Sequence, residues 1–274
     1  MKEAAAEADD WAPIIDCHAH VFLRDLPLAA GATHRPERSF TTEDYVRLLD
    51  EQRVPFGVIA APSFLGSYND YMFEALRCQP RLRGTAIVEP GIGPYELQAM
   101  DDDGIRGIRF SLRRYPTVPD LTSPEYRRLL RRIRDLDWHV HIFAENHRLA
   151  DLIPQLVESG VNLVVDHFGN PSHRDGFDCP GFQAVLRAVA AGRTWVKLSA
   201  PYRLEAGWDP QVLVDRLLAE AGPERLLWAS DCPWTAHERE VDFAATVDWF
   251  KAWVPDRRLR ERIGMTGLRL YRFI

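Results

Sequence analysis

The chain has 274 residues, of which 46% are hydrophobic and 27% charged, and its formal net charge is −6. This length suits one α/β barrel, which typically takes about 250 residues. The negative charge argues against a nucleic-acid-binding surface. The sequence also lacks a run of about 20 apolar residues, the length that spans a membrane. We therefore expect a globular protein whose partner is a small molecule.

The N-terminal residues and the cysteines indicate the cellular compartment in which we expect the protein. Residues 1–10 are rich in alanine and glutamate and lack the basic start of a secretory signal, so we expect residues 1–12 to be a flexible tail and residues 13–274 to form one domain. The four cysteines show no C-x-x-C spacing, which favours a reduced chain in the cytoplasm. The sequence leaves the assembly open between a monomer and a homodimer.

Eight short segments are apolar at nearly every position, which is typical of parallel strands buried on both faces. They are Ile14–Cys17, Gly57–Ala61, Gly84–Val88, Gly107–Phe110, His139–Phe143, Leu163–Asp166, Trp195–Leu198 and Leu226–Ala229. Between them, apolar residues recur at helical spacing, often after a capping residue or proline and before a glycine. The predicted helices start at Thr42 and Pro124 or cover Asn69–Cys78, Leu149–Ser159, Pro180–Ala191, Pro210–Ala221 and Glu240–Trp253.

Strand and helix patterns alternate along the chain without a linker, which favours a single-domain (β/α)8 TIM barrel of the α/β class. A doubly wound open sheet is the alternative, but no G-x-G-x-x-G follows the first strand, so the main signature of a dinucleotide fold is missing. Barrel active sites lie at the C-terminal ends of the strands. The polar residues at or just past those ends are His18, His20, Arg109, Glu145, His167, Ser199 and Asp231.

Three histidines and an aspartate at these strand ends make one candidate site. His18 and His20 stand two positions apart in an extended segment, so both side chains point to the same face. His167 follows the sixth strand, and Asp231 follows the eighth, which neighbours the first in a closed barrel. Such groups either bind a divalent metal or polarise a carbonyl and activate water. The alternative is unrelated polar residues, with Asp231 in a turn before Pro233.

Arginines after two of the strands indicate an anionic substrate such as a di-acid. Arg109 follows the fourth strand and Arg203 the seventh, and an arginine fork binds a carboxylate through two hydrogen bonds. Arg113 and Arg114 come soon after Arg109, and the sequence leaves open which of them faces the pocket. The alternative for each arginine is a salt bridge to a nearby acid such as Glu145.

Other residues near the strand ends are weaker candidates. Ser63 and Ser67 follow the second strand, where they either bind a polar substrate group at the next helix start or belong to a plain loop. His141 on the fifth strand is a candidate to face the site. Cys17 and Cys232 flank the histidines and the aspartate, and we expect them to be small buried packing residues rather than nucleophiles.

Together these motifs resemble those of the amidohydrolase superfamily, within it amidohydrolase-related family 2, and more narrowly the 2-pyrone-4,6-dicarboxylate hydrolases and related lactonases. The matching segments follow the family's order from residue 14 to about residue 240. They are Asp16–Phe22, Pro62–Gly66 with Asn69, Gly104–Phe110, Val165–Pro171, Trp195–Ser199 with Tyr202 and Arg203, and Ser230–Pro233.

The resemblance implies a (β/α)8 barrel that hydrolyses a lactone ester. The family's carbonyl-polarising histidines correspond to His18, His20 and His167, and its water-activating aspartate to Asp231. Its carboxylate-binding arginines correspond to Arg109, Arg203 and Arg114. Several members of this branch need no metal, whereas members with a metal use the same histidines and aspartate as ligands. The expected cofactor is therefore either none or one zinc or manganese ion.

The chain departs from the family pattern near the expected site. Trp234 stands where relatives often carry a histidine, Cys232 replaces a common tryptophan, and the fifth strand carries His139 and His141. The exact substrate is therefore open, and we expect a small anionic lactone, such as a pyrone dicarboxylate. The alternatives are a metal-dependent decarboxylase or other lyase of the superfamily, and a barrel that binds a ligand without turnover.

Overall fold

In the computed structural model, residues 11–32, 34–113 and 117–274 are described. Within them, eight strands form one parallel sheet in chain order. They are β1 (Ile15–Ala19), β2 (Phe56–Ala60), β3 (Leu82–Ala86), β4 (Ile105–Ser111), β5 (His139–Phe143), β6 (Asn162–Val165), β7 (Thr194–Leu198) and β8 (Leu226–Trp228). All eight strands predicted from the apolar segments are confirmed, with small shifts at their ends.

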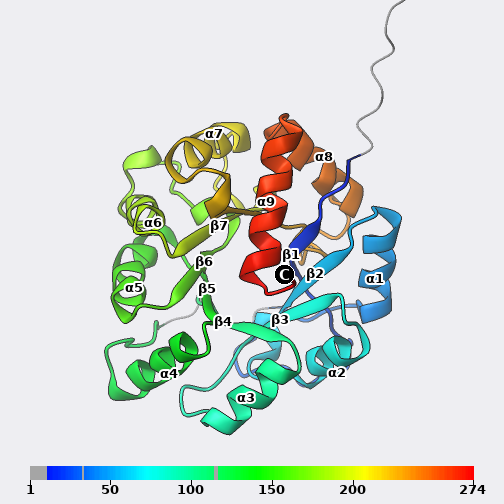
Figure 1. Cartoon of the computed structure of the whole chain (residues 1–274), viewed down its shortest axis with the longest axis vertical. Helices are drawn as coiled ribbons and strands as arrows, with labels where there is room; N and C mark the ends of the chain where they lie inside the picture. The colour runs from blue at the N-terminus through cyan, green and yellow to red at the C-terminus, as the bar shows by residue number, and fades with distance from the viewer. Residues whose placement is uncertain (1–10, 33, 114–116) are drawn as a thin grey trace, which may run out of the picture.

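Helices surround the strands as an outer ring (Figure 1). They are α1 (Thr42–Glu51), α2 (Asp70–Cys78), α3 (Pro94–Asp102), α4 (Pro124–Asp135), α5 (Asn146–Ser159), α6 (Pro180–Ala190), α7 (Pro210–Ala221), α8 (Phe243–Trp253) and α9 (Arg257–Leu270). Several begin as the sequence predicted. Thr41 caps α1 with a capping box, and Ser123 caps α4 ahead of its first-turn proline. The helices α3 and α9 were not among those that the sequence patterns predicted.

The first and last strands meet and close the barrel. A parallel bridge joins Ala19 to Cys232. The backbone N–H of Asp231 donates to the His18 carbonyl at 2.9 Å, and the N–H of His20 donates to the Cys232 carbonyl at 2.8 Å. The expected TIM barrel is therefore confirmed. Its seam places the His18 and His20 segment beside the Asp231 segment.

A register shift in β1 turns two histidines toward the barrel interior. The shift falls between Asp16 and Ala19 where β1 pairs with β2. Before it, Asp16 accepts a hydrogen bond from the Tyr45 hydroxyl of α1 at 3.1 Å. After it, His18 faces the opposite side of the strand, where its ring lies 5.0 Å from that of His141 on β5. The bulge thereby brings His18 toward the side chains of strands across the barrel.

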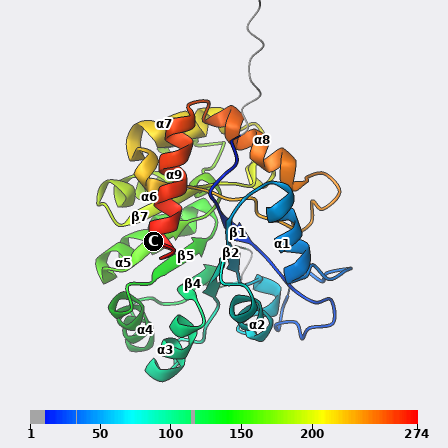
Figure 2. The ribbon, with the colours of Figure 1, turned by 45° about the vertical axis from the view of Figure 1, so that its right-hand side comes forward.

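The last helix covers one end of the barrel (Figures 1 and 2). Leu268 and Tyr271 pack in one buried cluster with residues from four strands, Ile15, Val58, Val164 and Leu227. The helix comes close to β1 at Gly267, where an added Cβ would lie 2.8 Å from Ile15 Cγ2 and 2.9 Å from Cys17 Sγ. This end of the interior is therefore apolar and filled, which leaves the other end for polar groups.

The first residue that the structure describes, Trp11, packs against the rest of the domain. Residues 1–10 of the predicted tail lie outside the described residues, whereas Trp11 is buried with its ring 5.8 Å from that of Phe250.

Within the described ranges, every helix is too short or too polar to span a membrane.

Candidate active site

The three histidines and the aspartate singled out in the sequence converge at the barrel mouth. Asp231 Oδ1 lies 3.6 Å from His18 Nε2, 3.9 Å from His20 Nε2 and 3.9 Å from His167 Nε2. The Nε2 atoms of His18 and His20 are 3.2 Å apart. All four side chains are buried. We call His18, His20, His167 and Asp231 the outer cluster.

Burial keeps the imidazoles of the outer cluster neutral. Desolvation lowers the pKa of His20 to about 3, with the nearby Arg109 acting in the same direction. It lowers the pKa of His167 to about 4 against the attraction of Asp231. His20 Nδ1 donates to the Ala60 carbonyl at 2.7 Å, and His167 Nδ1 lies 2.9 Å from the Ser199 hydroxyl. These two contacts orient the rings so that Nε2 of each faces Asp231.

Asp231 is an ionised carboxylate with its two oxygens in different surroundings. Oδ2 accepts from the Tyr202 hydroxyl at 2.8 Å and from Arg203 Nε at 2.7 Å. Burial alone would raise the pKa of Asp231, but Arg203 and the surrounding histidines lower it below its usual range. Its φ of 60° lies in the left-handed region, as does that of His167 at 47°. Such strain in non-glycine residues is common where side chains must be aimed at a functional site.

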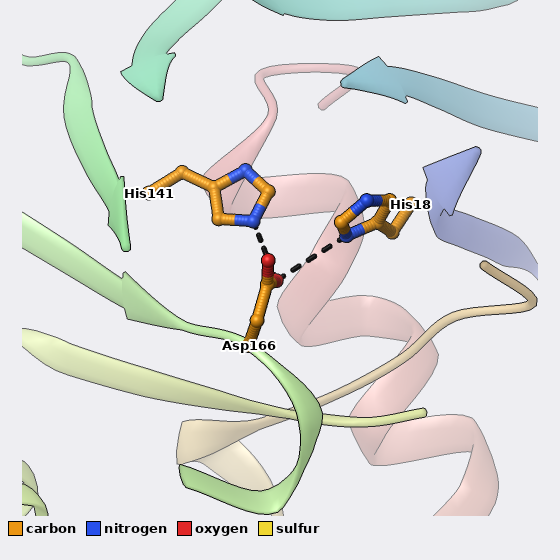
Figure 3. A group of neighbouring side chains, drawn as sticks. All are labelled: His18, His141 and Asp166. Carbon is orange, nitrogen blue, oxygen red and sulfur yellow. Dashed lines mark hydrogen bonds and ion pairs between the residues drawn. The ribbon is translucent and has the colours of Figure 1, made fainter. Parts of the chain in front are cut away.

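A second polar group lies directly beneath the outer cluster. Asp166 Oδ1 is 2.5 Å from His141 Nε2, 3.2 Å from His18 Nδ1 and 3.4 Å from Lys197 Nζ. Figure 3 shows His141 and His18 converging on this carboxylate from opposite sides. We call His141, Asp166 and Lys197 the inner cluster. His18 bridges the two clusters through its two ring nitrogens.

The inner cluster contains two residues that the sequence analysis did not assign. Lys197 is fully buried, and desolvation lowers its pKa while Asp166 opposes that shift. Asp166 has a pKa well below its usual range, because His141 and Lys197 outweigh its burial. A signal was present for both, since each charged residue interrupts or ends an otherwise apolar strand. His141, a candidate to face the site, lies in the inner cluster beside Asp166 and Lys197.

The two arginines predicted to bind substrate have different partners. Arg109 is 6% exposed, and its Nη1 donates to the Ala61 carbonyl at 2.7 Å. Its Nη2 lies 3.7 Å from Asp166 Oδ2. Arg203 pairs with Asp231 through Nε, and its Nη2 lies 3.3 Å from the Thr235 carbonyl. Arg203 is therefore tied to Asp231, whereas Arg109 lies between the Ala61 carbonyl and Asp166.

The remaining candidates lie farther out. The Arg113 guanidinium lies 5.2 Å from the centre of the Phe143 ring, and that ring is 4.8 Å from His167. Arg114 lies outside the described residues. Ser63 begins a short 3-10 helix after β2, Ser63–Leu65. Ser67 lines a separate cavity of about 450 Å³ between α2 and α3.

The cysteines near the outer cluster are buried and free. Burial raises the pKa of both the Cys17 and the Cys232 thiol, which keeps them protonated. Trp234 is also buried, and its indole N–H donates to the Ser230 carbonyl at 3.1 Å. Cys232 and Trp234, which differ from the family pattern, thus pack around the segment that holds Asp231.

An open cavity of about 690 Å³ lies between the loops that follow β1 and β8. Its walls come from the loop after β1 and the loop after β8, including Phe22, His34, Arg38, Pro233 and His237. The His237 ring lies 4.8 Å from that of Tyr202, whose hydroxyl binds Asp231. The cavity therefore approaches the outer cluster on the side of Tyr202, but none of the four residues of the cluster lines it.

The outer cluster has a suitable donor set for one divalent ion. The ligand atoms of His18, His20 and Asp231 lie within 4.8 Å of one another. A third imidazole nitrogen, His167 Nε2, lies 3.9 Å from Asp231 Oδ1. Three imidazoles and a carboxylate are a common zinc donor set. His18, His141 and Asp166 form a second group with the same spacing. In that group, however, Lys197 Nζ lies 3.2 Å from each histidine.

Comparison with curated proteins finds two informative relatives. The 2-pyrone-4,6-dicarboxylate hydrolase of Comamonas testosteroni is 28% identical over 94% of this chain and 89% of that protein. The 4-sulfomuconolactone hydrolase of Hydrogenophaga intermedia is 27% identical over 80% of this chain and 74% of that protein. Both relatives are lactone hydrolases by name.

Solved structures share the barrel. A probable 2-pyrone-4,6-dicarboxylic acid hydrolase from Acinetobacter baumannii, with citric acid bound, is 31% identical with a TM-score of 0.90, covering 95% of this chain and all of that chain. A 2,6-dihydroxybenzoate decarboxylase from Rhizobium is 15% identical with a TM-score of 0.69 and shows the fold alone. The family model described as amidohydrolase matches residues 15–273. The chain therefore belongs to the amidohydrolase family.

Proposed function

We propose that this protein is a hydrolase that opens a small lactone carrying at least one carboxylate. One observation carries the proposal, which is the placement of Asp231. Its Oδ1 faces three imidazoles, while its Oδ2 is held by Tyr202 and Arg203. The two lactone hydrolases among the relatives, aligned over most of this chain, support the same reaction class.

Asp231 acts in this proposal as the general base. Because Oδ2 is occupied, Oδ1 is the oxygen available to a water molecule that attacks the lactone carbonyl carbon. Asp231 takes one proton from that water and returns it to the ring oxygen when the ester C–O bond breaks. The products are one new carboxyl group and one new hydroxyl, so the reaction needs no further reactant.

His18 and His167 of the outer cluster act on the carbonyl oxygen, whereas neutral His20 donates its one N–H to the Ala60 carbonyl. Because burial keeps them neutral, they do not place extra positive charge beside Arg203 and Arg109 before the substrate arrives. An imidazole N–H aimed at the carbonyl oxygen stabilises the oxyanion that forms when water attacks. The Ser199 hydroxyl can donate to or accept from His167 Nδ1, so His167 can present Nε2–H when a substrate oxygen requires it.

The arginines orient the substrate. Arg109 donates to the Ala61 carbonyl through Nη1 and lies 3.7 Å from Asp166 Oδ2 through Nη2, and in this proposal its remaining N–H groups receive a substrate carboxylate. Arg203 donates to Asp231 through Nε and to the Thr235 carbonyl through Nη2, and in this proposal its remaining N–H groups contact an anion at the same edge of the site. Holding the ring by its carboxylate fixes the ester carbonyl next to the water on Asp231. A small anionic lactone is therefore the substrate class that we propose.

The same cluster would also hold a metal. His18, His20, His167 and Asp231 are the residues that would ligate one zinc or manganese ion. When bound there, such an ion would supply a Lewis acid for the ester carbonyl. With the ion bound, the other residues would keep the same roles. Arg109 and Arg203 would still orient the anion, and Tyr202 would still hold Asp231.

A panel of lactones assayed with and without chelator tests the proposal. The panel pairs each anionic lactone with its neutral methyl ester, and acid release is followed with a pH indicator. We expect hydrolysis of the anionic lactones and much weaker hydrolysis of the esters, because only the acids can engage Arg109. No acid release from any member, or CO2 release from hydroxybenzoates instead, would contradict the proposal and favour ligand binding or a lyase. The chelator arm reports whether turnover depends on a metal.

A further inference from the structure

The buried ammonium of Lys197 lies among three side chains whose spacing would otherwise suit a metal cation. Lys197 Nζ is 3.2 Å from His18 Nδ1, 3.2 Å from His141 Nε2 and 3.4 Å from Asp166 Oδ1. These are the three side chains drawn in Figure 3, which also have the spacing of metal ligands. None of the four side chains reaches solvent. Lys197 therefore interacts only with the groups around it, and their hydrogens must be arranged to suit it.

Counting donors shows which atoms can accept from Lys197. An ammonium has three N–H groups and no lone pair. The His141 Nε2 atom lies 2.5 Å from the ionised Asp166 Oδ1, so the hydrogen of that contact belongs to the imidazole. His141 Nε2 then has no lone pair for Lys197. Among these contacts, the acceptors that remain for the ammonium are Asp166 Oδ1 and His18 Nδ1.

The far side of the His18 ring leads to the same arrangement. His20 Nδ1 contacts the Ala60 carbonyl at 2.7 Å, so this nitrogen carries a hydrogen and the neutral ring keeps its lone pair on Nε2. His18 Nε2 lies 3.2 Å from that lone pair. If His18 carried its hydrogen on Nδ1, two lone pairs would face each other here. Two N–H groups would also face the ammonium of Lys197.

We propose that Lys197 is a positioning residue that holds His18 as its Nε2–H tautomer and thereby opposes a metal ion at the outer cluster. The resulting hydrogen bonds run in one direction. Lys197 donates to His18 Nδ1, His18 Nε2 donates to His20 Nε2, and His20 Nδ1 donates to Ala60. In this state His18 offers no lone pair to an ion, and it presents an N–H beside Asp231 Oδ1 at 3.6 Å.

Binding a metal through His18 Nε2 would require the other tautomer. The hydrogen would move to Nδ1, which lies 3.2 Å from Asp166 Oδ1 and could donate to it. Lys197 would then lose one of its two acceptors and face an added N–H. The ammonium therefore makes metal binding less favourable in two ways, by fixing the tautomer and by placing a positive charge beneath the site. This inference does not depend on the lactonase proposal.

The wild-type protein alone can test the tautomer. After dialysis against chelator, nitrogen-15 NMR of histidine-labelled protein distinguishes protonated from lone-pair ring nitrogens. His18 is assigned by comparison with the variant His18→Asn. We expect His18 to carry its hydrogen on Nε2 with Nδ1 unprotonated. A neutral His18 ring with its hydrogen on Nδ1 would overturn the proposal, and this result needs no Lys197 variant to fold.

A zinc titration of variants tests the opposition to metal. Calorimetry with zinc chloride compares wild type with Lys197→Met, which removes the charge, and Lys197→Arg, which keeps it. We expect Lys197→Met to bind zinc at least about tenfold more tightly, as outer-shell partners of metal ligands change affinity by about this factor, and Lys197→Arg to bind as weakly as wild type. Equal affinity in wild type and a folded Lys197→Met would overturn the proposal.

Discussion

Arg203 Nε lies 2.7 Å from Asp231 Oδ2, so one of the two arginines expected to bind substrate holds the candidate base. Asp231 is buried and the Arg203 side chain is 17% exposed, and the charge of Arg203 lowers the pKa of Asp231 against the effect of burial. Arg203 can therefore act in two ways, by aiming the carboxylate and by contacting an anion. Arg109, which donates to the Ala61 carbonyl and not to Asp231, can act only by contacting an anion.

This difference predicts that replacing Arg203 mainly affects kcat, whereas replacing Arg109 mainly affects KM. Arg203→Gln should lower kcat by about tenfold or more, because Asp231 loses a charge-assisted hydrogen bond that is worth about 1.5–3 kcal/mol. Arg109→Gln should mainly raise KM, because it removes a carboxylate partner without touching Asp231. Steady-state kinetics on one anionic lactone measures both. Equal effects of the two variants on kcat would contradict the division of roles.

Tyr202 gives a milder test of how Asp231 is aimed. Tyr202→Phe removes the hydroxyl that donates to Asp231 Oδ2 at 2.8 Å and leaves the ring in place. We expect kcat to fall by about tenfold, with KM nearly unchanged, since a hydrogen bond to a charged group is worth about 1.5–3 kcal/mol. Full activity in Tyr202→Phe would show that Arg203 alone is sufficient to orient the carboxylate.

The buried histidines predict loss of stability in acid. The folded-state pKa values of His20 and His139 are lowered to about 3 and that of His167 to about 4, against 6.5 for an ordinary histidine. The unfolded chain therefore binds more protons below pH 6.5, and each histidine costs up to about 1.4 kcal/mol per pH unit down to its folded pKa. The stabilisation is present above pH 6.5 and is lost as pH falls toward 4.

Asp16 acts in the opposite direction and offsets part of this loss. Burial raises its pKa from 3.8 to about 6, so its contribution recovers as pH falls through 6 toward 4. Urea unfolding at several pH values should show a net decrease in the free energy of unfolding below pH 6.5. The variant His139→Leu, in which one buried histidine is removed, should show a smaller slope with pH. A stability that is flat from pH 7 to 4.5 would contradict this account.

Gly267 tests the docking of α9 on β1. An alanine there would place its Cβ 2.8 Å from Ile15 Cγ2 and 2.9 Å from Cys17 Sγ. We expect Gly267→Ala to lower the free energy of unfolding by about 1–3 kcal/mol, the usual cost of overpacking. The control is Gly91→Ala, because the nearest atom to its Cβ is Glu125 Oε1 at 3.8 Å. If Gly267→Ala unfolds like this control, the helix does not dock as described.

The sequence predicted the strands well because they are short apolar runs with clear ends. It failed on α3 and α9 for identifiable reasons. In α3 only Leu97 and Met100 are buried, so the apolar stripe is too sparse to detect. In α9 the buried face includes Arg260 and two glycines, which do not read as an apolar stripe. Such faces are defined by what they pack against, which local sequence does not contain.

The same limit applied to the site. The barrel rule placed His18, His20, His167 and Asp231 at one mouth from strand ends alone. It did not predict that Arg203 pairs with Asp231 or that Lys197 lies beneath His18, because both contacts depend on the directions in which side chains from different strands point.

The most direct test of the central claim measures binding and turnover in Asp231→Asn. Asparagine keeps the size of the side chain but cannot take a proton from water. Isothermal titration with an anionic lactone and single-turnover kinetics on the same substrate give both quantities. The account predicts near-normal affinity with turnover reduced by about 10²–10⁴-fold, the usual contribution of a general base. Turnover within a few-fold of wild type would contradict the role assigned to Asp231.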